Sequence, residues 1–369
     1  MHKISIIIPT LGGGGAERLH VNLANDWISK DYEVEFILMQ NSGDNGTLIP
    51  LLSQKINVIN LNVQKIRYAF LPLTNYFKKT NRDIVICAMW PLTSICVLSW
   101  LFAGKRSKLF LSEHENLSKS YILERKVKAW ILKSTIKFSY PICNGLIAVS
   151  NGVKDDLTHL GKIKKNLVKV IYNPAATGKP VFCEYPSVKE KIWSGNFDHH
   201  ILSIGRLCLQ KDFITLIKAF KIITKNFNAK LIILGEGPER SNLEFLVKQL
   251  NLESKISLPG FVNDVKPWLS SSDLFVLSSK WEGFGNVLVE ALECGLPIVS
   301  TNCLSGPSEI LENGRYGKLV PTEDPSAMAL AIQQSLTAKH DHLKLMNRAN
   351  FFHVDKISNE YLSYFNSKS

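Results

Sequence analysis

Residues 274–302 read LFVLSSKWEGFGNVLVEALECGLPIVSTN, and this stretch decides the fold. The apolar runs 274–279 and 297–302 have the length and composition of buried strands, and the glycines within 283–286 mark a turn that opens a helix between them. A strand, a helix and a second strand in this order form a βαβ unit, in which the two strands lie parallel in one sheet. The stretch therefore predicts an α/β protein with a parallel sheet.

The same alternation of strands and helices runs through the rest of the chain. Between the short apolar runs lie segments with apolar residues at helical spacing, such as AERLHVNLANDWISK at 16–30. The runs that we interpret as strands are 4–10, 33–39, 56–62, 83–89, 108–114, 145–150 and 168–173 in the first half, and 200–206, 230–236, 255–261, 274–279, 297–302 and 317–321 in the second.

A chain of 369 residues suits two domains. The alternation is interrupted from Pro174 to His200, where prolines and glycines recur with little periodicity, so we interpret this segment as a linker. We therefore predict two domains, residues 1–178 and 179–369, with a C-terminal helix that can pack back on the N-terminal domain.

The positive charge is concentrated in the first half. The net charge is +12, and residues 1–189 contain 25 Lys and Arg against 13 Asp and Glu, which accounts for all of it. Such an asymmetry favours an anionic partner for that half, such as a membrane surface, a phosphorylated lipid or a nucleic acid. The seven cysteines are scattered without ligand spacing, which is typical of free thiols in a reducing cytosol.

The segment 84–104 contains no charged side chain and is long enough to span a bilayer as a helix. The alternative is a buried strand at 83–89 followed by a helix that Pro91 opens. We favour the strand and helix because Trp90, Pro91 and several hydroxyl side chains weaken a spanning helix.

Two loops that follow strands carry groups suited to a phosphate. Residues 11–18, LGGGGAER, open a helix whose amides and N-terminus attract an anion. Residues 204–213, IGRLCLQKDF, place Arg206 and Lys211 before another helix, where two cations can hold a diphosphate. Taken alone, each motif has an ordinary alternative, a flexible turn in the first case and solvated loop cations in the second.

The most specific pattern is the pair Glu282 and Glu290, eight residues apart. Glu282 falls in the loop and Glu290 about one turn into the following helix, so both carboxylates can face one ligand, with the free amides of the helix start between them. Carboxylates suit sugar hydroxyls and amides suit phosphates, so the arrangement fits a sugar nucleotide. The alternative is that Glu290 lies on an exposed helix face.

Together these motifs resemble the retaining GT-B glycosyltransferases of family four, the glycosyl transferases group 1. The resemblance covers essentially the whole chain, in order, from GGGGAER through LSEHEN, AVSNGVKDDL, VIYNP, SIGRLCLQKDF, LIILGEGPER and LPGFV to SSKWEGFGNVLVEALECGLPIVST. It implies a GT-B fold, in which two Rossmann-like domains face each other across a cleft. The N-terminal domain would bind the acceptor and the C-terminal domain the nucleotide sugar.

The resemblance also implies roles for individual residues. His114 would lie beside the donor sugar, Arg206 and Lys211 would hold the diphosphate leaving group, and Glu282 would contact hydroxyls of the transferred sugar. A lone histidine after a strand is often structural, but ligands of α/β proteins collect at the carboxyl ends of strands, where His114 lies. The residues expected to bind substrates are Gly14, Gly15, Arg18, Gly205, Gly235, Gly237, Phe261, Phe284, Gly285, Asn286, Val287 and Glu290, the last on the ribose hydroxyls.

For the chemistry, the resemblance implies a UDP-sugar as co-substrate, no cofactor and no bound metal. The sequence has no Asp-x-Asp motif, and side chains and helix ends would carry the phosphate charge instead. In the family model of a retaining reaction, the acceptor attacks from the face that the diphosphate leaves. The departing diphosphate takes the acceptor's proton.

Residues 119–137, KSYILERKVKAWILKSTIK, are predicted to form one basic amphipathic helix. Such a helix can lie on anionic lipid or hold a lipid diphosphate, and the alternative is a core-facing helix with a solvated basic face. With the GGxER and SEHxN motifs, it resembles the bacterial branch that adds N-acetylhexosamine to undecaprenyl-diphosphate-linked sugars in assembly of surface polysaccharides such as the lipopolysaccharide O-antigen. We therefore expect a lipid-linked saccharide acceptor, and a cytoplasmic protein held peripherally at the anionic inner face of the plasma membrane.

Two other functions stay open from the sequence. A sugar-nucleotide epimerase of GT-B fold would share both domains but use no acceptor. A non-enzymatic protein could use the basic half to bind sugars or nucleic acid. Because the sequence has no nucleic-acid-binding motif and no interleaved aromatic and basic platform, we expect no nucleic-acid partner.

Overall fold

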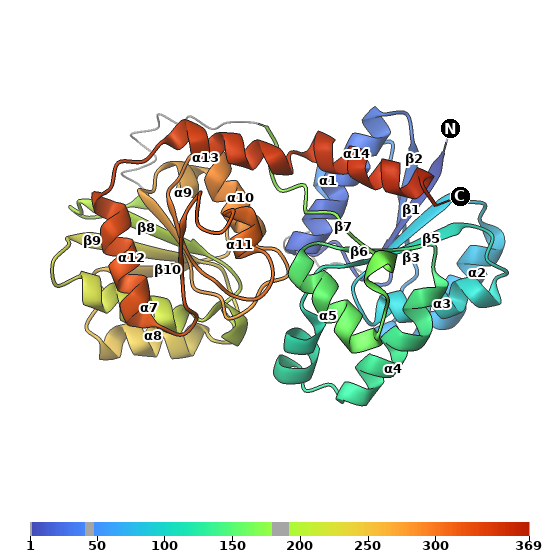
Figure 1. The fold of residues 1–369 in the computed structure, drawn as a ribbon, viewed down its shortest axis with the longest axis horizontal. Coiled ribbons are helices and arrows are strands. Elements are labelled where there is room, and N and C mark those ends of the chain that lie inside the picture. Colours follow the sequence, from blue (N-terminus) through green and yellow to red (C-terminus); the bar gives the residue numbers. More distant parts are fainter. Residues whose placement is uncertain (1, 41–47, 179–191, 369) are drawn as a thin grey trace. The chain divides into compact units, whose positions relative to one another are not determined.

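The structure, a computed structural model, describes residues 2–40, 48–178 and 192–368 and contains two compact units (Figure 1). Residues Met1–Pro174 and Val354–Ser369 form the first unit, and Ala175–His353 form the second. The chain thus leaves the first unit shortly before the boundary expected after residue 178 and returns to it for the last helix. Residues 179–191, the centre of the predicted linker, lie outside the described residues.

A seven-stranded sheet forms the middle of the first unit, in the order β3-β2-β1-β4-β5-β6-β7, and every neighbouring pair is parallel. The strand order reverses between β1 and β4, and loops at the carboxyl ends of strands around such a point bind ligands in open α/β sheets. The strands are β1 (Lys3–Ile8), β2 (Glu33–Leu38), β3 (Asn57–Asn60), β4 (Ile84–Ala88), β5 (Lys108–Glu113), β6 (Gly145–Ala148) and β7 (Val168–Val170), and the helices are α1 (Gly15–Ser29), α2 (Phe70–Lys79), α3 (Leu92–Phe102), α4 (Ala129–Ser139), α5 (Asn151–Gly161) and α14 (Val354–Asn366).

The last helix, α14, completes the core of the first unit. Tyr361 and Phe365 pack edge to face against Trp27 of α1, with ring centroids 6.3 and 5.9 Å apart. Phe365 also contacts Phe110 of β5, at 4.6 Å between ring centroids, and all four side chains are buried. Figure 1 shows α14 beside α1, although more than 300 residues separate them in sequence; the ion pair of Lys30 with Asp355 joins the two helices at the surface.

A six-stranded parallel sheet forms the middle of the second unit, in the order β10-β9-β8-β11-β12-β13. Here the strand order reverses between β8 and β11. The strands are β8 (His199–Ile204), β9 (Ala229–Leu234), β10 (Ile256–Gly260), β11 (Leu274–Leu277), β12 (Ile298–Thr301) and β13 (Lys318–Val320), and the helices are α7 (Phe213–Ile223), α8 (Arg240–Gln249), α9 (Lys266–Ser270), α10 (Asn286–Glu293), α11 (Pro307–Ile310), α12 (Pro325–Thr337) and α13 (His342–Ala349).

Every strand predicted from the sequence is present in one of these two sheets. Helices cover both faces of each sheet, so the inner strands are buried on both sides and are nearly continuous apolar runs, whereas the edge strands β3, β7, β10 and β13 are partly exposed. This confirms the expected α/β class and the two Rossmann-like units.

The uncharged segment 84–104 forms a strand and a helix, as predicted. Strand β4 is wholly buried in the sheet, and α3 begins directly after Pro91. In the part of the chain that the structure describes, no helix is long and apolar enough to cross a membrane.

The basic segment 119–137 is not one helix, which corrects the prediction. A π-helical segment, η3 (Ser118–Glu124), precedes the separate helix α4. Lys126 adopts a left-handed backbone conformation with a φ of 53°, and the amide of Val127 donates to the carbonyl of Tyr121 at 2.7 Å, so the chain turns between the two pieces. The apolar spacing gave no sign of this turn because both pieces bury apolar residues of their own.

Candidate functional site

Two loops meet where the strand order of the second sheet reverses. One follows β8 and the other follows β11. The amide of Lys280 donates to the carbonyl of Gln210 at 2.8 Å, and the Gln210 side chain donates to the carbonyl of Trp281 at 2.9 Å. The Ser278 hydroxyl donates to the carbonyl of Lys211 at 2.7 Å. Two motifs that lie far apart in sequence therefore form one site at the carboxyl edge of the sheet.

Lys211 and Glu282 form a buried ion pair at the centre of this site. Lys211 Nζ lies 2.5 Å from Glu282 Oε1, and the Ser279 hydroxyl donates to the same oxygen at 2.6 Å. Burial by itself would lower the pKa of Lys211, but the charge and hydrogen bond of Glu282 outweigh it, so the pKa of Lys211 is raised. The lysine is therefore a cation held in place by a carboxylate.

Arg206, the other predicted diphosphate ligand, lies in a different environment. It occupies the start of the loop after β8, and its side chain is exposed, whereas Lys211 at the end of the loop is mostly buried. Between them the loop offers one accessible guanidinium and one fixed ammonium group.

Helix α10 begins beside the ion pair. Gly285, the N-cap residue, has a φ of 100°, a conformation that favours glycine, and it has no side chain with which to cap the first turn. The N-terminus of a helix can bind an anion. Asn286 and Val287 form the first turn, and Glu290 follows one turn later; all three are partly exposed.

A second loop supports the backbone around Glu282. The amide of Glu282 donates to the carbonyl of Leu304 at 3.0 Å, and a Cβ at Gly306 would lie only 1.8 Å from the carbonyl oxygen of Phe284. Phe284 is itself buried and packs edge to face against Phe352, at 5.5 Å between ring centroids. The ring of Phe284 is therefore a packing group, and its backbone is what the loop can present to a ligand.

Two of the glycines that were expected to bind substrates lie where two loops pack closely together. A Cβ at Gly235 would lie 2.0 Å from the carbonyl oxygen of Gly205, and one at Gly237 would lie 2.3 Å from that of Leu207. The Leu207 amide donates to the Glu236 carbonyl at 2.9 Å. The absence of side chains at 235 and 237 thus lets the loops after β8 and β9 join backbone to backbone.

Phe261, one of the residues expected to bind substrates, directly follows the end of β10. Its side chain is 56% exposed. An exposed aromatic ring at the carboxyl edge of the sheet is available for stacking.

In the first unit, a residue that the sequence analysis did not single out shapes the glycine-rich loop. Glu17 accepts hydrogen bonds from the Gly14 amide and the Thr10 hydroxyl, each at 2.5 Å, and its side chain is buried. This carboxylate occupies the start of α1, so it disfavours a phosphate beside Gly14 and Gly15. Arg18 in the first turn is partly exposed. A glutamate three residues after the helix N-cap, the position from which it can bond back to the N-cap amide, could have indicated this contact.

His114 follows β5 directly and is buried at the carboxyl edge of the first sheet. Its Nε2 lies 2.9 Å from the Ser112 hydroxyl, and its ring packs edge to face against His20 of α1, at 5.2 Å between ring centroids. Burial lowers the pKa of His114 well below its usual range, and His20 lowers it further. His114 is therefore neutral at neutral pH. The sequence analysis missed His20, whose position fits the core-facing stripe of α1.

Glu113, next to His114, holds the turn between β4 and α3 by hydrogen bonds. Its carboxylate accepts hydrogen bonds from the hydroxyls of Thr93 and Tyr140 and, at 3.2 Å, from the amide of Trp90. Burial raises the pKa of Glu113 to about 7, although these hydrogen bonds oppose the rise.

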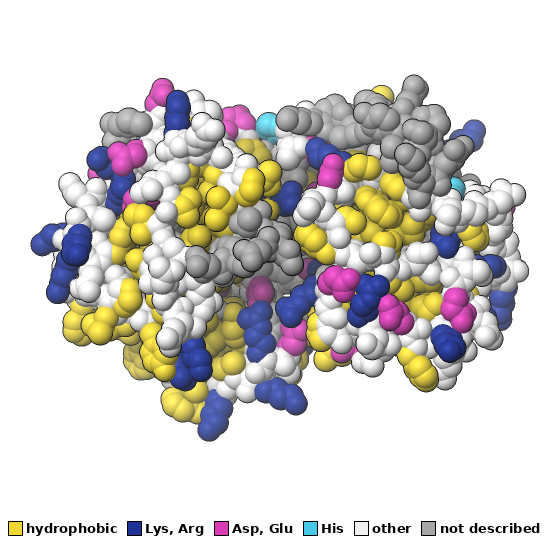
Figure 2. Space-filling model, turned by 180° about the vertical axis from the view of Figure 1, so that it is seen from behind, with side chains coloured by type: hydrophobic (Ala, Val, Ile, Leu, Met, Phe, Trp, Pro, Cys, Tyr) yellow, Lys and Arg dark blue, Asp and Glu magenta, His cyan; other side chains and the backbone are white. Residues whose placement is uncertain are grey.

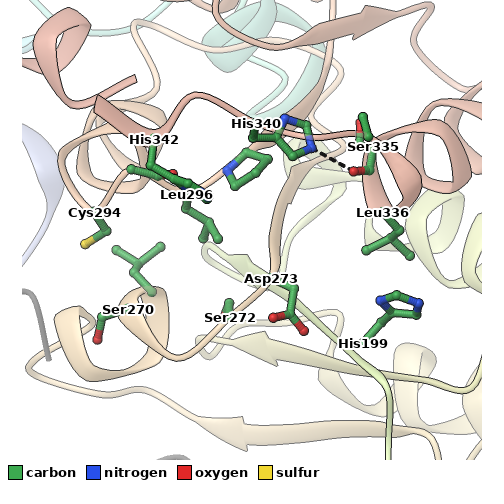
Figure 3. A pocket seen from close by; sticks show the side chains of 14 residues that line it. His199, Ser270, Ser272, Asp273, Cys294, Leu296, Ser335, Leu336, His340 and His342 are labelled. Atoms are coloured by element: carbon green, nitrogen blue, oxygen red, sulfur yellow. Dashed lines mark hydrogen bonds between the residues drawn. The ribbon is translucent and has the colours of Figure 1, made fainter. Parts of the chain in front are cut away.

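A separate pocket of about 250 Å³ lies at the amino ends of β8, β11 and β12, the opposite edge of the second sheet (Figure 3). His199, His340, His342 and Asp273 contribute its polar lining, and His340 hydrogen-bonds to the Ser335 carbonyl at 2.7 Å. None of the residues expected to bind substrates is among the described residues that line it. Across residues 2–40, 48–178 and 192–368, no three His, Cys, Asp or Glu side chains are grouped so that they could hold a metal ion.

Two family models match consecutive parts of the chain. Residues 13–179 match the model described as Glycosyltransferase Family 4, and residues 189–350 match that described as Glycosyl transferases group 1. The two matches together leave only short segments of the chain uncovered.

Two curated relatives come from Campylobacter jejuni. One is N-acetylgalactosamine-N,N'-diacetylbacillosaminyl-diphospho-undecaprenol 4-alpha-N-acetylgalactosaminyltransferase, 28% identical over 99% of each chain. The other is an alpha-1,4-N-acetyl-D-galactosaminyltransferase named for GalNAc-alpha-(1->4)-GalNAc-alpha-(1->3)-diNAcBac-PP-undecaprenol, also 28% identical, over 98% of each chain.

Solved structures share the fold at lower identity. The Anabaena protein HepE, crystallised with UDP and glucose, superposes over 100% of both chains with a TM-score of 0.80 and 21% identity. The crystal structure of TarM superposes over 99% of both chains with a TM-score of 0.80 and 14% identity.

Proposed function

Since the chain belongs to the glycosyltransferases that join a family 4 domain to a group 1 domain, we propose that it moves an N-acetylhexosamine, such as N-acetylgalactosamine, from a UDP-sugar to a lipid-linked saccharide. Two relatives that match it along nearly its whole length are named as alpha-N-acetylgalactosaminyltransferases of undecaprenyl-linked sugars. The observation that carries the proposal is the buried Lys211–Glu282 pair beside the N-terminus of α10, because this combination of charges suits a sugar diphosphate.

In the proposed donor complex, the diphosphate meets three sources of positive potential. Lys211 supplies a fixed ammonium group, Arg206 an exposed guanidinium, and the N-terminus of α10 the positive end of its helix dipole. Glu282 orients the hydroxyls of the transferred sugar, and Glu290 accepts hydrogen bonds from the ribose hydroxyls. His114 contacts the transferred sugar. These groups would carry the phosphate charge without a metal ion or another cofactor.

The proposed reaction retains the configuration at the anomeric carbon. The bond from that carbon to the β-phosphate oxygen breaks while the acceptor oxygen bonds to the same face of the carbon. The acceptor's proton passes to the departing phosphate oxygen. Lys211, Arg206 and the α10 amides stabilise the negative charge that grows on the diphosphate, which is where preorganised donors lower a barrier most.

We further propose that the first unit rests on the anionic inner face of the membrane, where a lipid-linked acceptor is found. The surface formed by η3, α4 and the turn between them carries exposed aromatic side chains among basic ones. Trp130 and Phe138 are 66% and 69% exposed, and Lys133 and Lys137 lie on the same side of α4. Figure 2 shows hydrophobic and basic side chains together along the lower edge of the unit at its left. Aromatic rings with neighbouring lysines are typical of surfaces that bind a membrane interface.

A panel of donors and acceptors tests the transferase function. The purified protein is incubated with UDP-GalNAc, UDP-GlcNAc, UDP-galactose or UDP-glucose, each with undecaprenyl-diphosphate-linked saccharides and with EDTA. Mass spectrometry should detect an acceptor extended by one N-acetylhexosamine, and NMR should give an α linkage. A β linkage would contradict the retaining reaction, and no transfer from any donor would contradict the function.

A parallel incubation with each UDP-sugar alone distinguishes the epimerase. A transferase leaves the donor unchanged or slowly hydrolyses it. Accumulation of an epimeric UDP-sugar without acceptor would replace the proposed function with sugar-nucleotide epimerisation.

A further inference from the structure

The neighbourhood of His114 contains buried polar atoms that have no partner. His20 Nε2 and His114 Nδ1 are both inaccessible to solvent and make no hydrogen bond within the described residues. They come from α1 and from the residue after β5. A buried donor or acceptor without a partner costs about 1–3 kcal/mol, so native proteins keep few of them and a concentration in one place calls for an explanation.

The existing hydrogen bond of His20 fixes its tautomer. His20 Nδ1 lies 2.7 Å from the carbonyl oxygen of Ala16, which can only accept, so Nδ1 carries the proton. Burial lowers the pKa of His20 to about 4, so the ring is neutral and its Nε2 holds a lone pair. His20 is thus an unused acceptor with no solvent exposure.

His114 can offer the matching donor. Its Nε2 lies 2.9 Å from the Ser112 hydroxyl, which can donate to it, and the proton of the neutral ring then sits on Nδ1. Tyr361 lies next to Ser112 from the other side: burial raises the pKa of its phenol, and the Ser112 hydroxyl partly offsets that rise. The Ser112 hydroxyl therefore lies close to polar groups of two residues, His114 after β5 and Tyr361 of α14.

The two rings already have nearly the spacing of a hydrogen-bonded pair. Their centroids are 5.2 Å apart and their planes are inclined at 64°. An N–H···N bond of about 2.9 Å between two imidazoles requires a similar centroid separation. A change in the ring orientation of His114 would bring Nδ1 and the His20 lone pair together, and hydrogen bonds at active sites often reach good geometry only when substrate is bound.

We propose that His20 is a positioning residue for His114, holding the His114 ring neutral, in its Nδ1–H tautomer and in one orientation while the transferred sugar is bound. The inference rests on the proposed function, because it assigns His20 a part in the same reaction. His20 itself contacts no substrate, since its side chain is fully buried. An aliphatic side chain would fill that core position without an unpaired nitrogen, so its stability alone does not require a histidine.

The variant His20→Leu separates positioning from packing. Since it fills the core and removes an unpaired nitrogen, its melting temperature should equal or exceed that of the wild type. The kcat for transfer should nevertheless fall about tenfold to a hundredfold, as for neighbours that share a hydrogen bond, with KM for the UDP-sugar changed little. The exposed histidine variant His2→Leu serves as a control and should leave both quantities unchanged.

A double-mutant cycle tests whether His20 acts through His114. In a His114→Gln background, His20→Leu should cause no further loss of kcat. Equal losses in both backgrounds, or an unchanged kcat in His20→Leu alone, would overturn the proposal.

Proton-detected ¹⁵N NMR of the imidazoles gives a readout that does not need transfer activity. The wild type saturated with UDP should show His114 with its proton on Nδ1, and His20→Leu should show a mixture of tautomers. If the wild type transfers no sugar but shows this pairing, the proposed function fails and the positioning of His114 stands. If transfer is present and His114 has the same tautomer in both proteins, the positioning role fails alone.

Discussion

The Nζ atom of Lys211 lies 2.5 Å from Oε1 of Glu282, a residue 71 positions later in the chain. The two belong to the two motifs that the sequence suggests for a diphosphate and for a sugar, and the structure joins them into one buried pair. A ligand that enters this site therefore meets a cation whose position is already fixed, so little reorganisation is needed to stabilise a leaving group.

Glu282→Gln should lower kcat for transfer by at least about tenfold while UDP still binds, because the substitution removes the charge that holds Lys211 and orients the sugar. Steady-state kinetics with the best donor of the panel measures kcat, and calorimetry with UDP measures binding. Glu253→Gln, an exposed substitution in the same unit, should behave as wild type. Wild-type kinetics in Glu282→Gln would remove this residue from the mechanism.

The same variant should also change how stability depends on pH. In the wild type the pKa of Lys211 is raised above its ordinary value of 10.5. The ion pair of Lys211 with Glu282 therefore contributes its full share of the folding stability below pH 10.5, and this share is lost as pH rises through the raised pKa. In Glu282→Gln the largest influences that raise the pKa of Lys211 are gone and burial should lower it, so the folded form releases a proton at a lower pH than the unfolded form. Urea unfolding should then show Glu282→Gln gaining stability from pH 7 to pH 10, where the wild type does not.

Glu290→Ala should weaken UDP binding by about 1.5–3 kcal/mol, the contribution of a hydrogen bond to a charged group, or roughly tenfold to a hundredfold in Kd. Calorimetry in EDTA measures the change, and Glu253→Ala is the exposed control. Binding that requires added Mg²⁺ or Mn²⁺ would contradict the metal-independent site, and an unchanged Kd would place Glu290 on a helix face away from the nucleotide.

Glu113→Gln should flatten the pH dependence of stability between pH 5 and pH 8. Burial raises the pKa of Glu113 from 4.5 to about 7, so the folded wild type binds more protons than the unfolded chain in this interval and loses stability as pH rises. The loss amounts to about 3 kcal/mol in order of magnitude. Denaturant unfolding at several pH values compares the variant with wild type and with the exposed variant Asp155→Asn. Parallel curves for Glu113→Gln and wild type would show that the carboxylate is ionised throughout.

Lys133→Glu combined with Lys137→Glu should release the protein from anionic vesicles, because each basic side chain near such a surface contributes about 1 kcal/mol. Liposome flotation at low and high salt measures the bound fraction. Trp130→Ala combined with Phe138→Ala should weaken binding at both salt concentrations, since the rings contribute apolar contact that salt does not screen. Binding that persists in both double variants would place the membrane contact elsewhere.

The strands could be predicted from the sequence because a strand buried on both faces is a local apolar run. Residues 84–88 illustrate this: they read IVICA and are wholly buried in β4. The break at Lys126 could not be predicted in the same way, since a single left-handed residue inside an apolar rhythm leaves no compositional trace. Gly235 and Gly237 were predicted to bind substrate, which stays a prediction; the backbone that they approach belongs to residues 205–207, a relationship set by the sheet order and not by the local sequence.

Contacts over long distances in sequence were beyond prediction for the same reason. The sequence motifs named Lys211 and Glu282 as ligands for different parts of a substrate, and their mutual ion pair appears only when β8 and β11 lie side by side. The contact of His20 with His114 likewise requires α1 to lie over the end of β5. The roles of these residues toward a substrate stay predictions.

The return of the chain to its first unit sets an order for synthesis. Tyr361 and Phe365 belong to the core around Trp27, yet they are made after the whole of residues 175–353. At about 5–20 residues per second, the ribosome needs on the order of 10 to 40 seconds to cover that distance. During this interval the first sheet is present without its last helix, and the aromatic face of α1 that α14 will cover stays open. The first unit therefore completes its core only after residues beyond 353 have been made, and any chaperone that shields Trp27 must leave before α14 can dock.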